Sequence, residues 1–209
     1  MSNETKDANK IDLSRRNLLK VAVAGLLAGV AAPLFPHLSS TYASETGTGG
    51  KNMLITYYSR TGNTREIANQ IHERVGSEII ELQTVKSYPE DYEAVKKQAM
   101  QELNSGFKPA LKTKVEKIGS YDVIFVGTPI WWGTIAAPVK SFLSQYDLSG
   151  KSIVPFITHA GSGLGRSVSD ISKLCPKSTL LEGVAIWGRD VKSAQNEVSE
   201  WLHKIKMTK

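Results

Sequence analysis

The chain has almost no cysteine, because Cys175 is the only one among its 209 residues. One cysteine excludes an internal disulfide, so the fold is not built on one. Cys175 lies near an expected helix end, a place more typical of a partly buried structural residue than of a reactive thiol. The sequence also lacks a dense block of lysine and arginine and any nucleic-acid-binding motif, although its formal net charge is +6. We therefore expect no nucleic-acid partner.

A hydrophobic run long enough to span a membrane is missing from the N-terminal region as well. Residues 21–35 are uncharged, but a helix of this length, at about 1.5 Å per residue, covers only roughly 22 Å of a hydrocarbon core of about 30 Å. With Arg15 and Arg16 before this run and the small residue Ala43 after it, residues 1–43 resemble a twin-arginine export signal. The resemblance implies the twin-arginine export machinery as a partner, a periplasmic or other extracytoplasmic location, and no stable membrane span after cleavage. Retention as an uncleaved anchor is the alternative.

Apolar runs alternate with helix-spaced apolar residues along residues 52–209, after a flexible lead-in at residues 44–51. Such alternation predicts one α/β domain, in which helices cover both faces of a parallel sheet. The five expected strands are at residues 53–58, 78–82, 121–127, 152–158 and 180–187. The expected helices are at residues 64–75, 91–104, 134–146, 164–174 and 190–206. In a doubly wound sheet, ligands bind beyond the carboxyl ends of the strands, so the loops that follow the strands are the candidates for a site.

The loop after the first expected strand lacks acidic residues and is rich in hydroxyls. This first loop comprises Ser59, Arg60, Thr61, Gly62, Asn63 and Thr64. Free amides at a helix N-terminus bind anions, and glycine allows a close approach, so we expect a phosphate monoester here. The GxxxxGK[ST] pattern is absent, which leaves no reason to expect ATP or magnesium. The alternative is an ordinary helix cap by Thr61 or Asn63.

The loop after the third expected strand contains two adjacent tryptophans. This second loop comprises Thr128, Pro129, Ile130, Trp131, Trp132 and Gly133. Two adjacent side chains cannot both point into the core, so we expect a tryptophan to cover a flat aromatic ligand. Packing in the core or in an interface, the common role of tryptophan, is the alternative.

The loop after the fourth expected strand is rich in glycine. This third loop, residues 158–167, includes His159, Ala160, Gly161, Ser162 and Gly165. Its backbone can lie flat against a ligand and present N–H and C=O groups. A merely flexible loop would explain this stretch in isolation. Together, however, the three loops describe one ligand, with a phosphate at one end and a planar ring at the other.

Three motifs in order, SxTGNT, TPIWWGTIAAPVKSFL and THAGSGLGRS, resemble those of the flavodoxin family, and the resemblance spans residues 53–203. It implies a doubly wound five-stranded sheet of order 2-1-3-4-5 that binds FMN. It also implies that Ser59, Thr61, Asn63 and Thr64 hold the phosphate, that residues 129–133 line the isoalloxazine ring, and that His159, Ala160, Gly161 and Gly165 close its pyrimidine side. Arg60 either adds charge to the phosphate site or points to solvent. The third loop has no aromatic residue, so we expect a tryptophan on one side of the ring only.

Two roles are open at this point. The first is an exported electron carrier between redox partner proteins, whose acidic surfaces would suit the 21 basic and 17 acidic side chains of residues 44–209. The alternative is an FMN-dependent NAD(P)H or quinone-type reductase. We favour the carrier because no long insertion is present beyond residues 87–120, because the helix in that segment is charged, and because NAD(P)H is scarce outside the cytoplasm. A third reading is a binding module that no longer uses flavin, which the three intact loops disfavour.

Overall fold

The computed structural model describes residues 50–208. The expected export signal at residues 1–43 and nearly all of the lead-in lie outside these residues, so both stay predictions. Within the described part of the chain, no helix is both long and apolar enough to cross a membrane.

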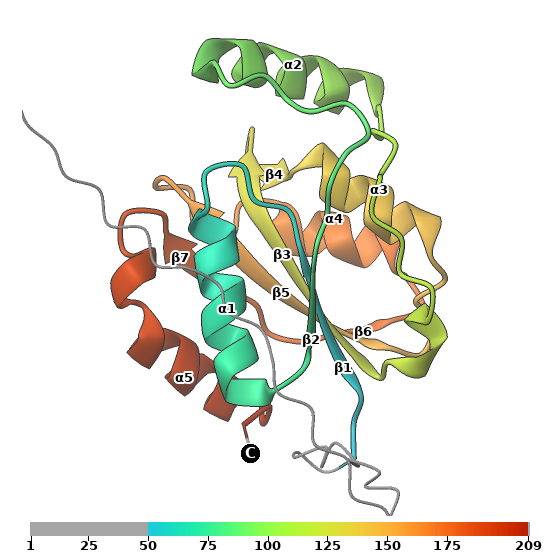
Figure 1. Cartoon of the computed structure of the whole chain (residues 1–209), viewed down its shortest axis with the longest axis vertical. Coiled ribbons are helices and arrows are strands. Elements are labelled where there is room, and N and C mark those ends of the chain that lie inside the picture. The colour runs from blue at the N-terminus through green and yellow to red at the C-terminus, as the bar shows by residue number, and fades with distance from the viewer. Residues whose placement is uncertain (1–49, 209) are drawn as a thin grey trace, which may run out of the picture. The chain divides into compact units, whose positions relative to one another are not determined.

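A parallel sheet forms the centre of the domain (Figure 1). Its strands, in spatial order, are β2 (Glu78–Glu81), β1 (Met53–Tyr57), β3 (Val123–Trp131), β5 (Ser152–His159) and a last strand in two pieces, β6 (Thr179–Leu180) and β7 (Val184–Trp187). If β6 and β7 are counted as one strand and the five strands are renumbered along the chain, their spatial order is 2-1-3-4-5. The predicted doubly wound fold is therefore confirmed.

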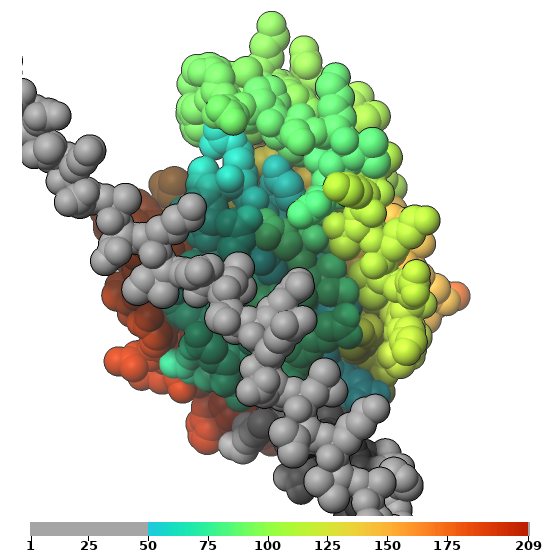
Figure 2. All heavy atoms as spheres, in the orientation of Figure 1, coloured from blue at the N-terminus to red at the C-terminus, as the bar shows by residue number. Residues whose placement is uncertain are grey.

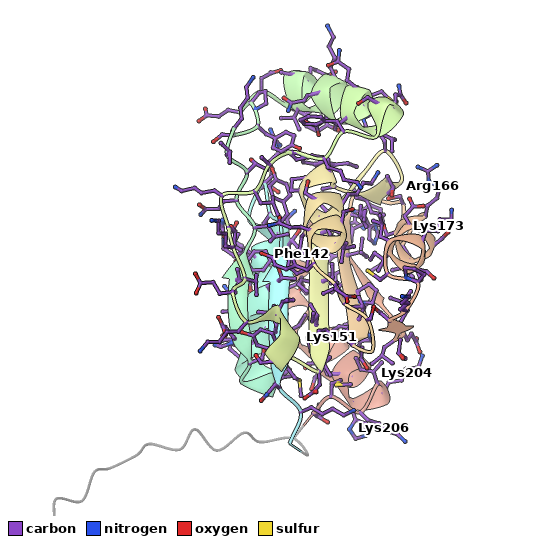
Figure 3. The ribbon with its side chains drawn as sticks, turned by 90° about the vertical axis from the view of Figure 1, so that its right-hand side faces the viewer. Phe142, Lys151, Arg166, Lys173, Lys204 and Lys206 are labelled. Atoms are coloured by element: carbon purple, nitrogen blue, oxygen red, sulfur yellow. The ribbon has the colours of Figure 1, made fainter. Side chains whose placement is uncertain are left out.

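Helices cover both faces of this sheet. One face packs against α1 (Asn63–Val75) and α5 (Gln195–Lys204), and the other packs against α3 (Ala137–Gln145) and α4 (Ser167–Leu174) (Figure 1). The strands are continuously apolar because neighbouring residues serve opposite layers. Phe142 of α3, labelled in Figure 3, is among the largest fully buried side chains, and burying it stabilises the fold by roughly 1.5–3 kcal/mol.

The helix α2 (Tyr92–Ser105) occupies a different place, beyond the carboxyl ends of the strands (Figure 1). The space-filling view shows the atoms of α2, in green, standing over that edge of the domain (Figure 2). Asp91 begins the helix, because its side chain accepts a hydrogen bond from the N–H of Ala94 at 2.7 Å, and Gly106 ends it with a φ of 67°. The predicted helix therefore forms, but it does not lie on a face of the sheet.

The segment that follows α2 returns along the side of the domain next to β2. It is held there by an antiparallel bridge between Leu111 and Thr84 and by a hydrogen bond from the N–H of Lys112 to the C=O of Gln83 at 2.7 Å. Val115 of this segment is buried in the same apolar cluster as the side chains of α3 and α4. An extended chain therefore contributes to the core on the way from α2 to β3.

The helix expected at residues 134–146 begins later than predicted, at Ala137. Thr134 and Ile135 instead form a short strand, β4 (Thr134–Ile135), which pairs antiparallel with the end of β3. The hairpin turns at Trp132 and Gly133, which have φ values of 52° and 78°. Such positive φ values match the twist of a tight hairpin.

Other boundaries also differ from the prediction. The third strand, expected at residues 121–127, begins at Val123 and continues to Trp131. The last strand, expected without a break at residues 180–187, is interrupted opposite Pro155, which has no N–H to continue the ladder from β5. The last two helices begin at Ser167 and Gln195, later than residues 164 and 190. Before α4 the chain makes a turn, and before α5 it forms a short 3₁₀ helix at Val191–Ser193. Sequence periodicity does not separate either from the helix that follows.

Cys175 closes α4 and is buried. Burial raises the pKa of its thiol to about 11, so very little reactive thiolate forms at neutral pH. This agrees with the structural role expected from the sequence.

Candidate functional site

The first loop follows β1, as predicted. The second does not lie wholly after its strand, because β3 continues to Trp131 and contains residues 128–131, and β5 likewise contains Thr158 and His159 of the third loop. All three stretches still meet at the carboxyl edge of the sheet. There they border a cleft of about 470 Å³, a volume in the range of small-molecule sites. The predicted residues that line it are Arg60, Thr61, Asn63, Thr64, Pro129, Ile130, Trp131, Trp132, His159 and Ala160. The other predicted residues, Ser59, Gly62, Thr128, Gly133, Gly161, Ser162 and Gly165, belong to the same loops without lining the cleft.

The first loop presents unpaired donors before the first turn of α1. Gly62 precedes the helix with a φ of 91°, and no side chain caps the helix, which rules out the alternative of an ordinary cap. Ser59 Oγ and Arg60 Nε are buried, and neither has a hydrogen-bond partner within residues 50–208. Buried polar atoms are nearly always paired, so these two indicate a ligand or solvent partner.

A second hollow, of about 600 Å³, adjoins the cleft at this loop. Arg60 and Thr61 line both spaces, whereas Ser59 lines only the second. The Nη2 of Arg60 donates a hydrogen bond to the C=O of Glu90 at 2.6 Å, just before α2. Arg60 therefore links the first loop to the approach of α2, a role that neither sequence alternative included.

Thr64 connects the first loop to the third. Its side chain is buried, and its Oγ1 lies 2.8 Å from the Oγ1 of Thr158 at the end of β5. Only one hydroxyl donates in this pair, so the other keeps its proton for a further acceptor.

The two adjacent tryptophans of the second loop point to different surroundings. Trp131 packs edge-on against Tyr58 and Tyr88, with ring centroids 5.5 and 4.9 Å away. Burial raises the pKa of Tyr58 to about 12 and also raises that of Tyr88, so both phenols stay neutral. Trp132 is 43% exposed, and its Nε1–H donates to the C=O of Lys96 on α2 at 2.9 Å. One tryptophan is therefore structural, and the other joins the cleft to α2.

The second and third loops touch through their backbones. A Cβ at Gly165 would lie 2.5 Å from the C=O oxygen of Gly133, and the N–H of Arg166 donates to that oxygen at 2.7 Å. In the third loop the Nδ1 of His159 accepts a hydrogen bond from the N–H of Gly161 at 2.9 Å. This bond fixes the orientation of a side chain that lines the cleft.

Sequence reasoning missed two groups that line the cleft. The first is the inner side of α2, and the second is the turn after β7; their members are Tyr92, Val95, Lys96 and Ala99, and Trp187, Gly188 and Arg189. Trp187 is the last residue of β7, and Gly188 and Arg189 follow it at the same carboxyl edge, so the rule that selected the other loops could have selected this turn. Nothing in the local sequence indicated that α2 borders a site.

The turn after β7 packs closely on the other loops. A Cβ at Gly188 would lie 2.6 Å from the Nδ2 of Asn63, and the Gly188 N–H donates to the C=O of His159 at 2.7 Å. The ring of Trp187 lies 5.7 Å from that of His159, and the Arg189 guanidinium lies 4.1 Å from the indole centroid. The cleft therefore has tryptophans from two elements, where the sequence led us to expect a cover on one side.

The charged residues that line the cleft are all cationic. They are Arg60, Lys96 and Arg189, and no aspartate or glutamate lines it. Lys96 pairs with Glu93 at 3.2 Å, and Arg189 pairs with Asp190 at 3.6 Å. All four side chains are exposed, so these pairs contribute little and leave the cations open to an anionic ligand.

Comparison with known proteins gives a consistent picture. A family model described as flavodoxin matches residues 52–205. A crystal structure from Bacteroides eggerthii, assigned as a flavoprotein, is 30% identical with a TM-score of 0.66, over 74% of this chain and 98% of that one. A flavoprotein from Lactobacillus acidophilus, solved in complex with FMN, is 27% identical with a TM-score of 0.59, over 71% of this chain and 99% of that one.

A curated relative covers a smaller part of the chain. It is an NAD(P)H dehydrogenase (quinone) from Sinorhizobium fredii, which is 32% identical over 94 residues, or 44% of this chain. The matched part spans 45% of that relative, less than half of its length.

Proposed function

The chain belongs to the flavodoxin family, and we propose on this premise that it binds FMN in the cleft and transfers electrons through it. The observation that carries the proposal is that one cleft, whose lining contains no aspartate or glutamate, joins the N-terminus of α1 to a region lined by Trp132 and Trp187. A phosphate ester on a planar ring system is the ligand that fits both ends.

The first loop fits the phosphate of FMN. Thr61 and Asn63 line the cleft at the start of α1, and Ser59 of the same loop, which lines the adjoining hollow together with Thr61, adds a buried hydroxyl without a partner inside the described domain. Gly62 adopts a φ of 91°, a conformation that suits glycine and turns the backbone into the helix. The N–H groups of the first helical turn and the helix dipole then favour a dianion.

The second and third loops fit the ring system. Residues 129–132 present an apolar surface on one side, and His159 with Ala160 closes the neighbouring edge. The flavin, when bound, supplies the ability to accept and donate electrons, while the protein binds it, orients it and sets its electrostatic surroundings. The hydrogen bond from the Gly161 N–H holds His159 in one orientation beside it.

The direct test is the visible spectrum of the purified full chain, with the released cofactor identified. We expect flavin absorbance bands and about one FMN per chain. A colourless protein that also fails to take up added FMN would overturn the proposal, and a binding module without flavin would then be the better interpretation.

For the role of the flavin, we propose reduction of a small acceptor as the first candidate. The sequence argument for a carrier rested partly on the charged helix in residues 87–120. This helix is α2, and its Tyr92, Val95 and Lys96 form a wall of the cleft, which narrows the approach of a partner protein but leaves room for a small molecule. The name of the curated relative, NAD(P)H dehydrogenase (quinone), points in the same direction.

The second candidate is the exported electron carrier. The positive charge of the domain supports it, because exposed cations such as Arg166 and Lys173, which lie on one side of the domain in Figure 3, would attract acidic redox partners. Reoxidation of the chemically reduced holoprotein separates the two roles. A reductase gives rates that saturate with a small quinone, whereas a carrier is reoxidised faster by an acidic redox protein, at a rate that falls steeply with salt.

We also propose that the chain is exported through the twin-arginine machinery and works outside the cytoplasm. The support is the sequence pattern at Arg15 and Arg16, ahead of an apolar run and a small residue at position 43. Replacing both arginines by lysine should leave the protein in the cytoplasm with its FMN content unchanged. Unchanged export of this variant would contradict the proposal.

A further inference from the structure

We propose that α2 gives the cleft a second subsite, which binds a planar aromatic electron acceptor that carries an anionic group such as a sulfonate, carboxylate or phenolate. The inference rests on the proposed function, because it places this acceptor beside a bound flavin. It adds the chemical class of the acceptor and the residues that select it, Tyr92 and Lys96.

The first observation is an excess of exposed aromatic surface in the cleft. Among residues 50–208, the large apolar side chains that are most exposed are Val85, Tyr92, Phe107, Trp132 and Trp187, and three of these five line the cleft. Tyr92, at the start of α2, is 66% exposed. A bound flavin ring has two faces, and Trp132 and Trp187 would each cover one of them. The ring of Tyr92 then remains for a second planar ligand.

The second observation is that the cation of α2 stands beside an apolar floor of the cleft. Val95 and Ala99 line the cleft one helical turn apart as largely buried side chains, and Lys96, which lies between them in sequence, lines it as an exposed one. The C=O of Lys96 accepts the hydrogen bond from Trp132, so α2 and the second loop are fixed to each other at this point. A flat apolar body with a charged edge matches such a floor and its cation.

The third observation concerns the distribution of charge. The FMN phosphate carries about −1.5 to −2 charges and belongs at the first loop, where Arg60 lies. The backbone C=O of Lys96 is bonded to Trp132 of the second loop, so we place the Lys96 side chain at the ring end of the cleft, away from the first loop. Its partner Glu93 is 72% exposed and does not line the cleft, so an anionic ligand can compete with it. The acceptor therefore supplies the missing negative charge.

The experiment is equilibrium binding to the oxidised, FMN-loaded full chain. The probes are 1,4-naphthoquinone-2-sulfonate and neutral 1,4-naphthoquinone, and the readout is tryptophan fluorescence or the perturbation of the flavin spectrum. No turnover is involved, since both partners are oxidised. We expect the sulfonate to bind about tenfold more tightly, an advantage of the size that one weakly screened charge pair provides.

The decisive variant is Lys96→Gln, with Lys97→Gln as its matched control. Lys97 is the next residue on the same helix, is exposed, and does not line the cleft. Lys96→Gln should reduce the tenfold preference to about twofold or less without changing the affinity for the neutral quinone or the FMN content. Lys97→Gln should keep the preference. Tyr92→Leu should weaken the binding of both quinones by a similar factor.

Four outcomes would overturn the inference. Equal affinity for both quinones in the wild-type chain excludes selection by charge. An equal loss of the preference for the sulfonate in Lys96→Gln and Lys97→Gln means that the preference reflects general electrostatics. If NADPH binds tightly, and if its affinity falls in Lys96→Gln while the affinity for the quinones does not, the subsite belongs to a dinucleotide donor. If the chain holds no FMN, the proposed function itself fails, and the inference fails with it. FMN content measured on the same samples distinguishes these cases.

Discussion

The helices α1 and α2 border the same cleft, yet they are held in very different ways. α1 begins at the first loop and buries Ile67, Ala68 and Ile71 in the core beneath the sheet. α2 buries only Val95, Ala99 and Glu102, and lies beyond the edge of the sheet. The end of the cleft that fits the phosphate is therefore part of the core, whereas the wall proposed for the acceptor is an attached element.

What attaches α2 is a short set of polar contacts. Arg60 donates to the C=O of Glu90, Trp132 donates to the C=O of Lys96, and the Tyr88 hydroxyl donates to the buried Glu102 carboxylate at 2.7 Å. Each contact is worth roughly 0.5–3 kcal/mol, so α2 can open at a cost well below that of unfolding the sheet. The difference suggests a division of roles, with a firmly held cofactor and a wall that adapts to an acceptor.

The largest effect is expected at the end of the cleft formed by α1. The double variant Ser59→Ala with Thr61→Ala removes two hydroxyls that would donate to the FMN phosphate. Hydrogen bonds to charged groups are worth about 1.5–3 kcal/mol each, so FMN affinity should fall by at least about 100-fold in a fluorescence titration of the apoprotein. Riboflavin, which lacks the phosphate, should bind both proteins within about twofold. An equal loss for FMN and riboflavin would place the phosphate elsewhere.

A smaller effect is expected where the second and third loops touch. Gly165 and Gly163 have similar φ values, 50° and 58°, but a Cβ at Gly165 would meet the Gly133 C=O oxygen at 2.5 Å, while a Cβ at Gly163 meets nothing within 4 Å. Gly163→Ala should cost about 1 kcal/mol from its φ alone. Gly165→Ala should cost about 1–3 kcal/mol more, because the loops must separate. Thermal unfolding measures both, and equal melting temperatures would show that the contact between the loops does not constrain the fold.

The two helices also differ in how well the sequence predicts their parts of the site, because the end at α1 could be predicted and the wall formed by α2 could not. The first loop is readable because each feature is local: hydroxyls, Gly62 and a helix start directly after a buried strand. The strand order came from the resemblance of the three motifs, and the meeting of the loops followed from that order. Trp187 was missed because it is the last residue of a strand, whereas the predicted site residues came from stretches rich in hydroxyls, glycine or tryptophan.

The rest depends on tertiary contacts that carry no local signal. The pattern of α2 predicts a helix, and the buried face made by Val95, Ala99 and Glu102 is compatible with packing on the sheet or elsewhere. Its place is decided by Tyr88, Arg60 and Trp132, which bond to it from other elements. The different surroundings of Trp131 and Trp132 likewise follow from the hairpin, in which Trp132 has a positive φ. A non-glycine residue rarely adopts this conformation, so the sequence does not predict it.

The smallest predicted effect tests the attachment of α2 itself. Trp132→Phe keeps an aromatic ring but removes the Nε1–H that donates to the C=O of Lys96. A neutral hydrogen bond contributes about 0.5–1.5 kcal/mol, so amide exchange in α2 should become roughly 2-fold to 10-fold faster while exchange in α1 is unchanged. Trp187→Phe is the matched control, because it changes a tryptophan of the same cleft that has no contact with α2 among the described hydrogen bonds. If both variants accelerate α2 equally, or if α1 responds as strongly as α2, the two helices open together and the wall of the cleft is as firmly held as its cofactor end.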